Sequence, residues 1–173
     1  MGGIRQGSSV HMSREITVLS GAERGEIFEV INAAAGMYEG VIPPEADTDP
    51  YMPMSELEAE MDEMQFYGAV RDRIVGVIGV QERSGVSLIR HLYVRPDAQR
   101  EGIGTELLET GIERADSETV LVGTWGAAEW AIEFYAEHGF ENLGTDTDLL
   151  STYWDIPDHQ REASVVLRYR ERR

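Results

Sequence analysis

The sequence contains no cysteine and no lysine among its 173 residues. Without cysteine the chain has no disulfide framework, no thiolate zinc site and no cysteine nucleophile. The absence does not decide whether the protein works in an oxidising or a reducing compartment. No apolar run approaches the roughly 18 residues that a membrane-spanning helix needs, and no secretory signal is visible. These absences favour a cytoplasmic protein without a membrane partner.

The charge balance is strongly acidic. Asp and Glu number 32 against 15 basic residues, all of them arginine, which gives a net charge of −17. Such a charge repels nucleic-acid phosphates, so we expect no nucleic-acid partner. Hydrophobic residues make up 42% of the chain, and its length suits one domain with a sizeable core. The Gly- and Ser-rich start predicts a disordered tail or expression remnant at 1–13, followed by a single domain at 14–173.

An acidic, lysine-free composition is haloarchaeal-like and indicates a halophilic protein. At 1 M salt the Debye length is about 3 Å, so the repulsion between surface carboxylates becomes tolerable. We therefore expect the thermal midpoint and the activity to rise as KCl is raised from about 0.1 M toward about 1 M. Melting curves and assays across that series test this, and a fold that is most stable and most active near about 0.1 M would contradict it.

Hydrophobic periodicity predicts a mixed sheet with flanking helices. Strands are expected at 16–19, 65–70, 74–82, 86–94, 120–124, 140–143 and 163–169, helices at about 21–36, from 55, after 104 and before 139, and loops at 37–54 and 146–161. The short turns predict antiparallel neighbours, whereas the unit from 86 to 124 needs a parallel crossover. We predict an α/β (α+β) fold whose mixed, mostly antiparallel sheet of about seven strands is flanked by about four helices.

The segment from Leu92 to Thr105 has the order strand, turn, helix. An apolar run ends at Pro96, then Gly102 and Gly104 precede an amphipathic helical pattern. The first N–H groups of a helix have no partner inside the helix, and with the helix dipole they form a phosphate site. Glycine removes the Cβ that would keep a diphosphate away from the backbone. The segment therefore predicts an anion-binding turn.

Three phosphate-binding patterns share this layout. A P-loop needs a lysine, which the chain lacks. A dinucleotide fingerprint needs a small third residue where this chain has Leu107. The remaining pattern, Gln99-x-x-Gly102-x-Gly104 after a strand that ends in Val-x-Pro, resembles motif A of the GNAT superfamily of acyl-CoA-dependent N-acyltransferases.

A second motif supports this resemblance. The run Ala131-x-x-Phe134-Tyr135-x-x-x-Gly139-Phe140 resembles motif B of the same superfamily, although Ala128 stands where the family often has Asn. The expected element order is also the GNAT order, and the resemblance covers nearly the whole chain after residue 12. It implies a GNAT-fold N-acetyltransferase that moves an acetyl group from acetyl-CoA to a primary amine by direct attack in a ternary complex. It further implies that no metal is needed and that the protein is a monomer or homodimer.

The resemblance also implies roles for individual residues. Backbone groups of Leu92, Tyr93 and Val94 receive the pantetheine arm and polarise the thioester carbonyl. The diphosphate is assigned to the turn residues Gln99, Arg100, Glu101, Gly102, Ile103, Gly104 and Thr105, while Ala131 and Phe134 lie beside the arm and Tyr135 faces the leaving thiolate. The local excess of positive charge from Arg90, Arg95 and Arg100 suits a polyanionic coenzyme.

His91 is the candidate general base, because it titrates in the useful range and precedes the carbonyl-binding segment by one residue. A packed structural histidine, Glu82 or a water relay are the alternatives, and an acceptor that is already partly neutral needs no base. Acceptor recognition is assigned to the segments 37–54 and 149–161. The alternative functions are a non-catalytic acyl-CoA-binding or regulatory domain and an NAD-binding fold.

Overall fold

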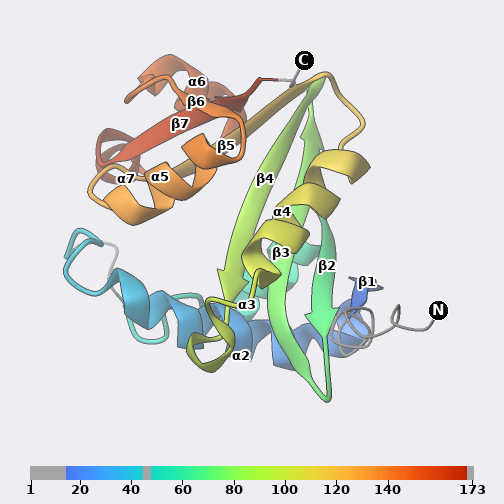
Figure 1. The fold of residues 1–173 in the computed structure, drawn as a ribbon. Coiled ribbons are helices and arrows are strands. Elements are labelled where there is room, and N and C mark those ends of the chain that lie inside the picture. Colours follow the sequence, from blue (N-terminus) through green and yellow to red (C-terminus); the bar gives the residue numbers. More distant parts are fainter. Residues whose placement is uncertain (1–14, 45–47, 171–173) are drawn as a thin grey trace.

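The computed structural model describes residues 15–44 and 48–170, so the tail expected at 1–13 lies outside the described residues. Its seven-stranded sheet has the order β1-β2-β3-β4-β5-β7-β6 (Figure 1). The strands are β1 (Glu15–Leu19), β2 (Gln65–Val70), β3 (Ile74–Arg83), β4 (Val86–Val94), β5 (Thr119–Trp125), β6 (Phe140–Asn142) and β7 (Ser164–Tyr169). The β4–β5 pair is parallel and every other neighbouring pair is antiparallel. The predicted mixed, mostly antiparallel sheet is confirmed.

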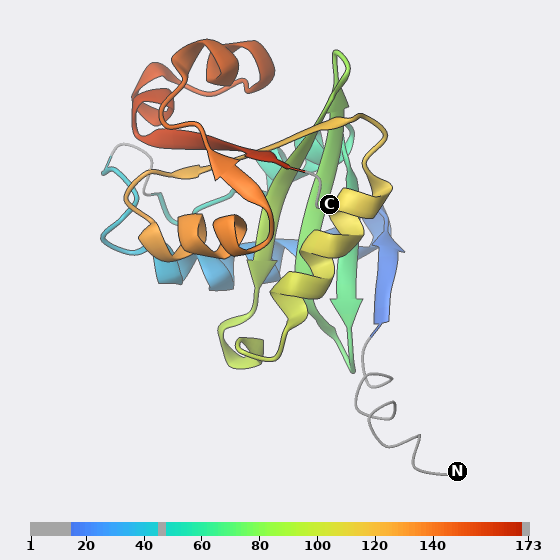
Figure 2. The same ribbon diagram turned by 45° about the horizontal axis from the view of Figure 1, so that its top comes forward.

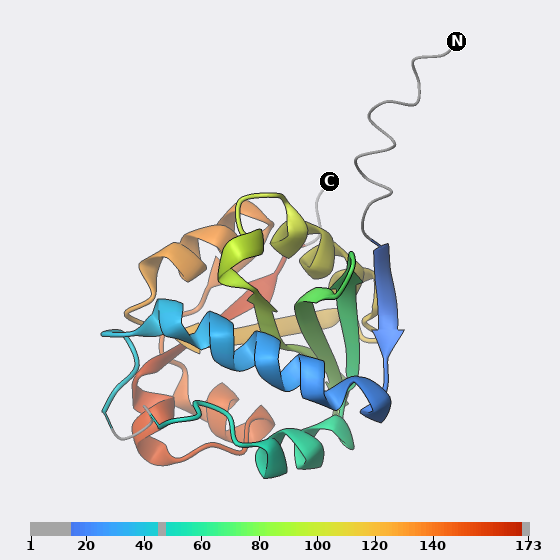
Figure 3. The same ribbon diagram turned by 90° about the horizontal axis from the view of Figure 1, so that it is seen from below.

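Six α-helices flank the sheet within the described residues. They are α2 (Arg24–Ala35), α3 (Met54–Met61), α4 (Ile103–Arg114), α5 (Glu129–Glu137), α6 (Thr147–Tyr153) and α7 (Asp158–Glu162). Seen from below, α4 and α5 lie on one side of the sheet and α3, α6 and α7 on the other (Figure 3). Helix α4 is the parallel crossover, and Figure 2 shows it lying across β3 and its neighbours. No helix in the described ranges is long and apolar enough to cross a membrane.

Alternate side chains of the central strands belong to two hydrophobic clusters, one on each face of the sheet. Tyr67 and Ile78 belong to a cluster with Ile103, Leu107 and Leu108 of α4, whereas their chain neighbours Phe66 and Val77 belong to a cluster with α2 and α3. Successive side chains of a strand point to opposite faces, so β2 and β3 each contribute to both clusters. The sheet is therefore covered on both faces over its central strands.

The prediction of a loop at 146–161 is wrong, because the structure has the helices α6 and α7 there. Asp146 caps α6 by accepting a hydrogen bond from Leu149 N at 3.1 Å. Leu150 and Trp154 are buried in a cluster with β4, β5 and β7. Helices of one or two turns are too short to show a clear period, and their stability comes from this packing. These two helices also explain why the described part of the chain has six α-helices where the sequence predicted about four.

Glu82 at the end of β3 ties β4 to the segment that leads into β5. Its carboxylate accepts hydrogen bonds from Ser87 Oγ at 2.6 Å and from Ser117 Oγ at 3.0 Å. The backbone N–H of Asp116 also donates to it, at 2.9 Å. Because Ser87 is fully buried, these bonds hold the paired ends of β4 and β5 together. We call this network the Glu82 clasp.

Candidate functional site

The candidate site forms where β4 and β5 separate. The two strands pair only over 86–89 and 119–122 in the described chain. Beyond that point β4 stays on β3, while β5 continues alongside β7, so the two strands diverge (Figure 1). A strand edge without a neighbour presents N–H and C=O groups that a ligand can bind. The part of β4 that follows Ile89 therefore has one open edge.

A β-bulge in β4 brings two neighbouring side chains to one face. The β3–β4 ladder shifts register between Val77 and Gly79, and His91 adopts a left-handed φ of 56°. A bulge inserts one extra residue, so the strict alternation of faces is interrupted. Arg90 forms an ion pair with Glu60 of α3, and the His91 ring contacts the same carboxylate. Both side chains therefore lie on the face that α3 covers.

The turn between β4 and α4 holds the end of the helix against the strand. Gln99 Nε2 donates to the carbonyl oxygen of Val94 at 2.9 Å. Gly102 is the N-cap of α4, with a φ of 82° that suits glycine. The first helical hydrogen bond runs from Glu106 N to Gly102 O at 3.1 Å. The N–H groups before it have no acceptor within the helix and form an anion-binding end.

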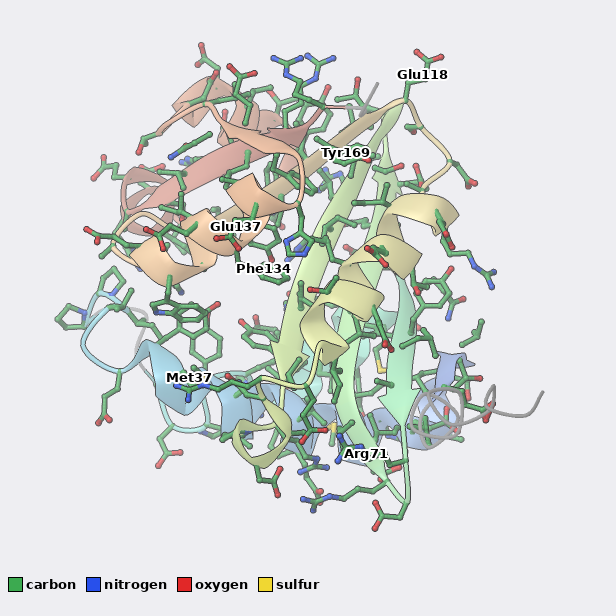
Figure 4. The ribbon with its side chains drawn as sticks, in the orientation of Figure 1. Met37, Arg71, Glu118, Phe134, Glu137 and Tyr169 are labelled. Carbon is green, nitrogen blue, oxygen red and sulfur yellow. The ribbon has the colours of Figure 1, made fainter. Side chains whose placement is uncertain are left out.

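A cavity of about 390 Å³ lies against this turn. Of the residues assigned to the site from sequence, it brings together Leu92, Tyr93, Val94, Gln99, Arg100, Gly102, Ile103, Gly104, Thr105, Ala131, Phe134 and Tyr135. The remaining wall comes from Ala34, Met37, Tyr38, Ala98 and Trp130. Phe134 on α5 and Met37 after α2 lie on opposite sides of it (Figure 4). We call this space the first cavity.

Two residues assigned from sequence do not line the first cavity. Glu101 forms an ion pair with Arg71 of the turn between β2 and β3, so its side chain has a structural partner there. His91 lies instead at the neighbouring cavity described below. No carboxylate lines the first cavity in the described chain, and Arg100 is its one charged lining residue.

The three arginines near the turn have different surroundings. Arg100 lines the first cavity. Arg95 is buried, with its Nε donating to Ile74 O at 2.8 Å and its guanidinium 3.4 Å from Glu29. Arg95 therefore does not line the first cavity, and its guanidinium is held by Ile74 O and Glu29. Arg90 faces the other cavity.

Tyr135 has a buried ring and an unpartnered hydroxyl. The ring packs against Phe134 and Phe140, with centroid distances of 5.3 and 5.6 Å. Burial, with a smaller contribution from Tyr38, raises the pKa of Tyr135 well above its usual value. In the described chain no hydrogen bond to its hydroxyl is present, although buried hydroxyls usually have a partner. The hydroxyl is therefore protonated at neutral pH and can donate to a ligand.

A second cavity of about 120 Å³ shares Tyr38, Leu92, Tyr93 and Tyr135 with the first. The two segments assigned to acceptor recognition contribute Tyr38, Tyr51, Leu150, Trp154, Ile156 and Gln160 to its wall. Arg90, His91, Thr124, Trp125 and Ser164 line it as well. The shared residues form a common wall, so ligands in the two cavities would meet at the divergence of β4 and β5.

Neighbouring tyrosines form the common wall. The Tyr38 and Tyr93 rings pack edge to face, with centroids 6.2 Å apart, and the polar groups of Tyr93 and Trp125 lie near Tyr51, as that of Thr124 does near Tyr38. Burial raises the pKa of Tyr38 to about 12, and burial raises the pKa of Tyr93 well above its usual value. All these hydroxyls are therefore neutral at physiological pH. The sequence grouped Tyr38 and Tyr51 with a loop but did not indicate this arrangement.

His91 is held on the second cavity by Glu60. Its Nε2 contacts the Glu60 carboxylate, and its ring stacks on Phe66 at 5.9 Å between centroids. Burial lowers the pKa of His91 below its usual value, so the imidazole is neutral at pH 7. Burial acts to raise the pKa of Glu60, but its hydrogen bond to His91 and the charge of Arg90 leave that pKa lowered. Sequence reasoning missed Glu60, since only the fold brings it to His91.

Glu82, considered as an alternative base, lines neither cavity. Its carboxylate is occupied by the Glu82 clasp. The structure therefore does not favour Glu82 as a base.

Comparisons with known proteins agree on one family. A family model described as an acetyltransferase (GNAT) domain matches residues 33–148. A GNAT-family acetyltransferase from Staphylococcus aureus Mu50 superposes with a TM-score of 0.68 at 19% identity, covering 90% of this chain and 98% of that one. The PaiA N-acetyltransferase of Thermoplasma acidophilum, solved with coenzyme A, gives 0.68 at 18% identity, covering 91% and 99%. The ribosomal-protein-S18-alanine N-acetyltransferase of Escherichia coli gives 0.66 at 15% identity, covering 90% and 92%. Comparison with curated protein sequences finds no match.

Proposed function

Because the chain belongs to the GNAT acetyltransferase family, we propose that it moves an acetyl group from acetyl-CoA to a primary amine by direct attack in a ternary complex. The proposal depends mainly on one observation, the two cavities that meet where β4 and β5 diverge. Two reactants that are bound in adjacent cavities and meet beside the shared lining residues can react directly, without a covalent enzyme intermediate.

The residues of the first cavity suit acetyl-CoA. Its anion-binding end consists of the N–H groups at the start of α4, with Arg100 as the nearby cation and no lining carboxylate in the described chain. The open edge of β4 offers backbone groups to the amides of a pantetheine arm, and Ala131 and Phe134 supply apolar contact. A Cβ added at Gly104 would meet Phe134 at 3.6 Å, so glycine keeps this space clear.

The chemistry needs an oxyanion donor, a proton donor and a proton acceptor. The amine nitrogen forms a bond to the thioester carbonyl carbon, and the carbon–sulfur bond then breaks. We assign oxyanion stabilisation to a backbone N–H at the end of β4. Tyr135, whose hydroxyl has no partner in the described chain, donates to the leaving sulfur. His91, which is neutral and lines the second cavity, accepts the proton that the amine loses.

The direct test is CoA release by the full-length protein. Purified protein is mixed with acetyl-CoA and a panel of primary amines, and free thiol is measured together with acetyl-CoA binding by calorimetry. We expect thiol release that requires an amine. Tight acetyl-CoA binding without turnover on any amine would instead favour a non-catalytic binding domain. Thermal stabilisation by NAD but not by acetyl-CoA would overturn the assignment of the first cavity.

The activity should depend on the protonation of His91. Its neutral form is the active one, and its pKa is lowered by burial, so kcat/KM should fall only as the pH drops below the usual histidine value of about 6.5. His91→Asn should remove this low-pH limb and lower kcat/KM at neutral pH about 10-fold, because water can partly replace the base.

A pH–rate profile of kcat/KM for the acceptor, measured at saturating acetyl-CoA, checks this expectation. His159→Asn is the matched control, since His159 lines neither cavity, and it should keep the wild-type profile. An unchanged profile in His91→Asn would show that His91 is a packed structural histidine.

A further inference from the structure

The second cavity has no lining carboxylate among the described residues, although the chain holds 32 acidic residues. Among the residues that the structure describes, Arg90 is the one lining side chain with a permanent charge, and His91 lies beside it. An acceptor with several ammonium groups would find no carboxylate on this described wall and would lie beside the positive charge of Arg90, which is unfavourable. Acidic residues of the 37–54 segment, such as Glu39 and Asp49, do not line the cavity. The wall therefore disfavours polyamines and aminoglycosides.

The guanidinium of Arg90 is fixed in position but keeps donors for a ligand. Its Nη1 donates to Gln81 Oε1 at 2.8 Å, and its Nη2 lies 3.6 Å from Glu60 Oε1. Gln81 is buried, and the Arg90 side chain is 16% exposed. Arginine has five N–H donors in a planar fork that matches a carboxylate. Glu56 also acts on Arg90 through its charge. Gln81 and Glu60 leave several of the five N–H donors for a ligand, and Arg90 lines the cavity.

Two carboxylates of α3 lie near Arg90 but do not line the second cavity. Glu60 contacts both Arg90 and His91, and Glu56 acts on Arg90 through its charge. Arg90 itself lines the cavity, so the charged group that an acceptor meets directly on this wall is a cation. A carboxylate of the acceptor can therefore bind the guanidinium.

The bulge sets the spacing between the two groups that would contact the acceptor. Arg90 and His91 are consecutive and lie on the same face of the sheet, and the guanidinium and the imidazole both contact the same oxygen of Glu60, Oε1. Two groups that share one partner atom lie close enough to contact the carboxylate and the amine of one small acceptor. The cavity volume of about 120 Å³ suits a small molecule, and Tyr51 and Trp154 contribute aromatic rings to its largely polar wall.

From these observations we infer that the acceptor is a free amino acid. Its carboxylate binds Arg90, its amine lies beside His91 and faces the thioester, and its side chain packs against Tyr51 and Trp154. This inference rests on the proposed acetyl transfer and names its second substrate.

The test compares matched amines in the CoA-release assay with the full-length wild-type protein. The panel holds the common amino acids, their carboxamides, their decarboxylated amines, short peptides, spermidine and kanamycin. We expect the best substrate to be a free amino acid, with kcat/KM roughly 10- to 100-fold above that of its own carboxamide and decarboxylated amine, the range for one charge-assisted contact. Carboxamides also report on peptide N-termini, in which the carboxylate is replaced by an amide.

Arg90→Gln should remove the preference for the acid over the carboxamide while turnover of the carboxamide persists. Arg24→Gln is the matched control, because Arg24 also pairs with a glutamate of α3, Glu58, at 3.2 Å but lies outside both cavities. It should keep the wild-type preference. Melting curves show whether each variant is folded. If Arg90→Gln does not fold, the comparison of the amino acid with its carboxamide in the wild-type protein still tests the inference.

The outcomes separate the two proposals. Turnover that is best with spermidine, kanamycin, a peptide or a decarboxylated amine overturns the amino-acid inference and leaves acetyl transfer intact. A carboxylate preference that survives in folded Arg90→Gln overturns the role of Arg90. No turnover with any amine, despite acetyl-CoA binding, overturns the proposed function and this inference with it.

Discussion

Tyr135→Phe is expected to lower kcat roughly 10- to 1000-fold, within the range for the loss of one general acid. An ordinary tyrosine pKa of about 10 exceeds a thiol pKa of about 8.5, so full proton transfer to the thiolate is uphill by roughly 2 kcal/mol. Burial raises the pKa of Tyr135 further. We therefore expect the hydroxyl to act mainly as a hydrogen-bond donor to the developing thiolate.

Phenylalanine should keep the fold at this position, because the ring contacts of Tyr135 need no hydroxyl and the described chain gives that hydroxyl no partner. Tyr169→Phe is the matched control: Tyr169 also packs on Phe140, at 5.3 Å, and lines neither cavity. The measurement is kcat and KM for acetyl-CoA in both variants, with melting curves. Equal turnover in wild type and Tyr135→Phe would remove this residue from the mechanism.

Gly104→Val is expected to raise KM for acetyl-CoA about 100-fold, equivalent to about 2.7 kcal/mol of binding free energy. A Cβ at this position would meet Phe134 Cζ at 3.6 Å and Val94 Cγ2 at 3.9 Å, which are ordinary contacts. The fold therefore accommodates the Cβ, but the two methyl groups would fill space in the first cavity beside the start of α4. Catalysis at saturating acetyl-CoA should change less than KM.

Gly25→Val supplies the control for helix propensity. Gly25 is the second residue of α2, as Gly104 is of α4, and a Cβ there would meet nothing within 4 Å. Initial rates against acetyl-CoA concentration, with binding by calorimetry, compare the two variants. If Gly104→Val bound acetyl-CoA as well as Gly25→Val does, the diphosphate would have to bind elsewhere.

Elements with strong periodicity were predicted well from the sequence. The strands at 65–70 and 86–94 have the predicted bounds, because alternation and short turns are local signals. The first cavity was also anticipated in large part, since the turn with Gly102 and Gly104 is contiguous in the chain and Phe134 and Tyr135 form a second contiguous motif. A motif can be recognised in a sequence because its residues are close together along the chain.

Contacts between distant segments could not be predicted. Glu60 reaches His91 across 31 positions of sequence, and only the packing of α3 on the sheet brings them together. The bulge at His91 depends on the register with β3, which no residue type in β4 reveals. Arg95 looked like a loop cation, yet its guanidinium bonds to Ile74 O inside the fold. Burial of a charged side chain depends on partners that lie far away in the chain.

The Glu82 clasp has a consequence for how products leave. It fastens β4 and β5 at their paired ends. We therefore expect these strands to stay fixed while products leave, and the first cavity to widen at Met37 and Trp130, which line it and are 43% and 45% exposed.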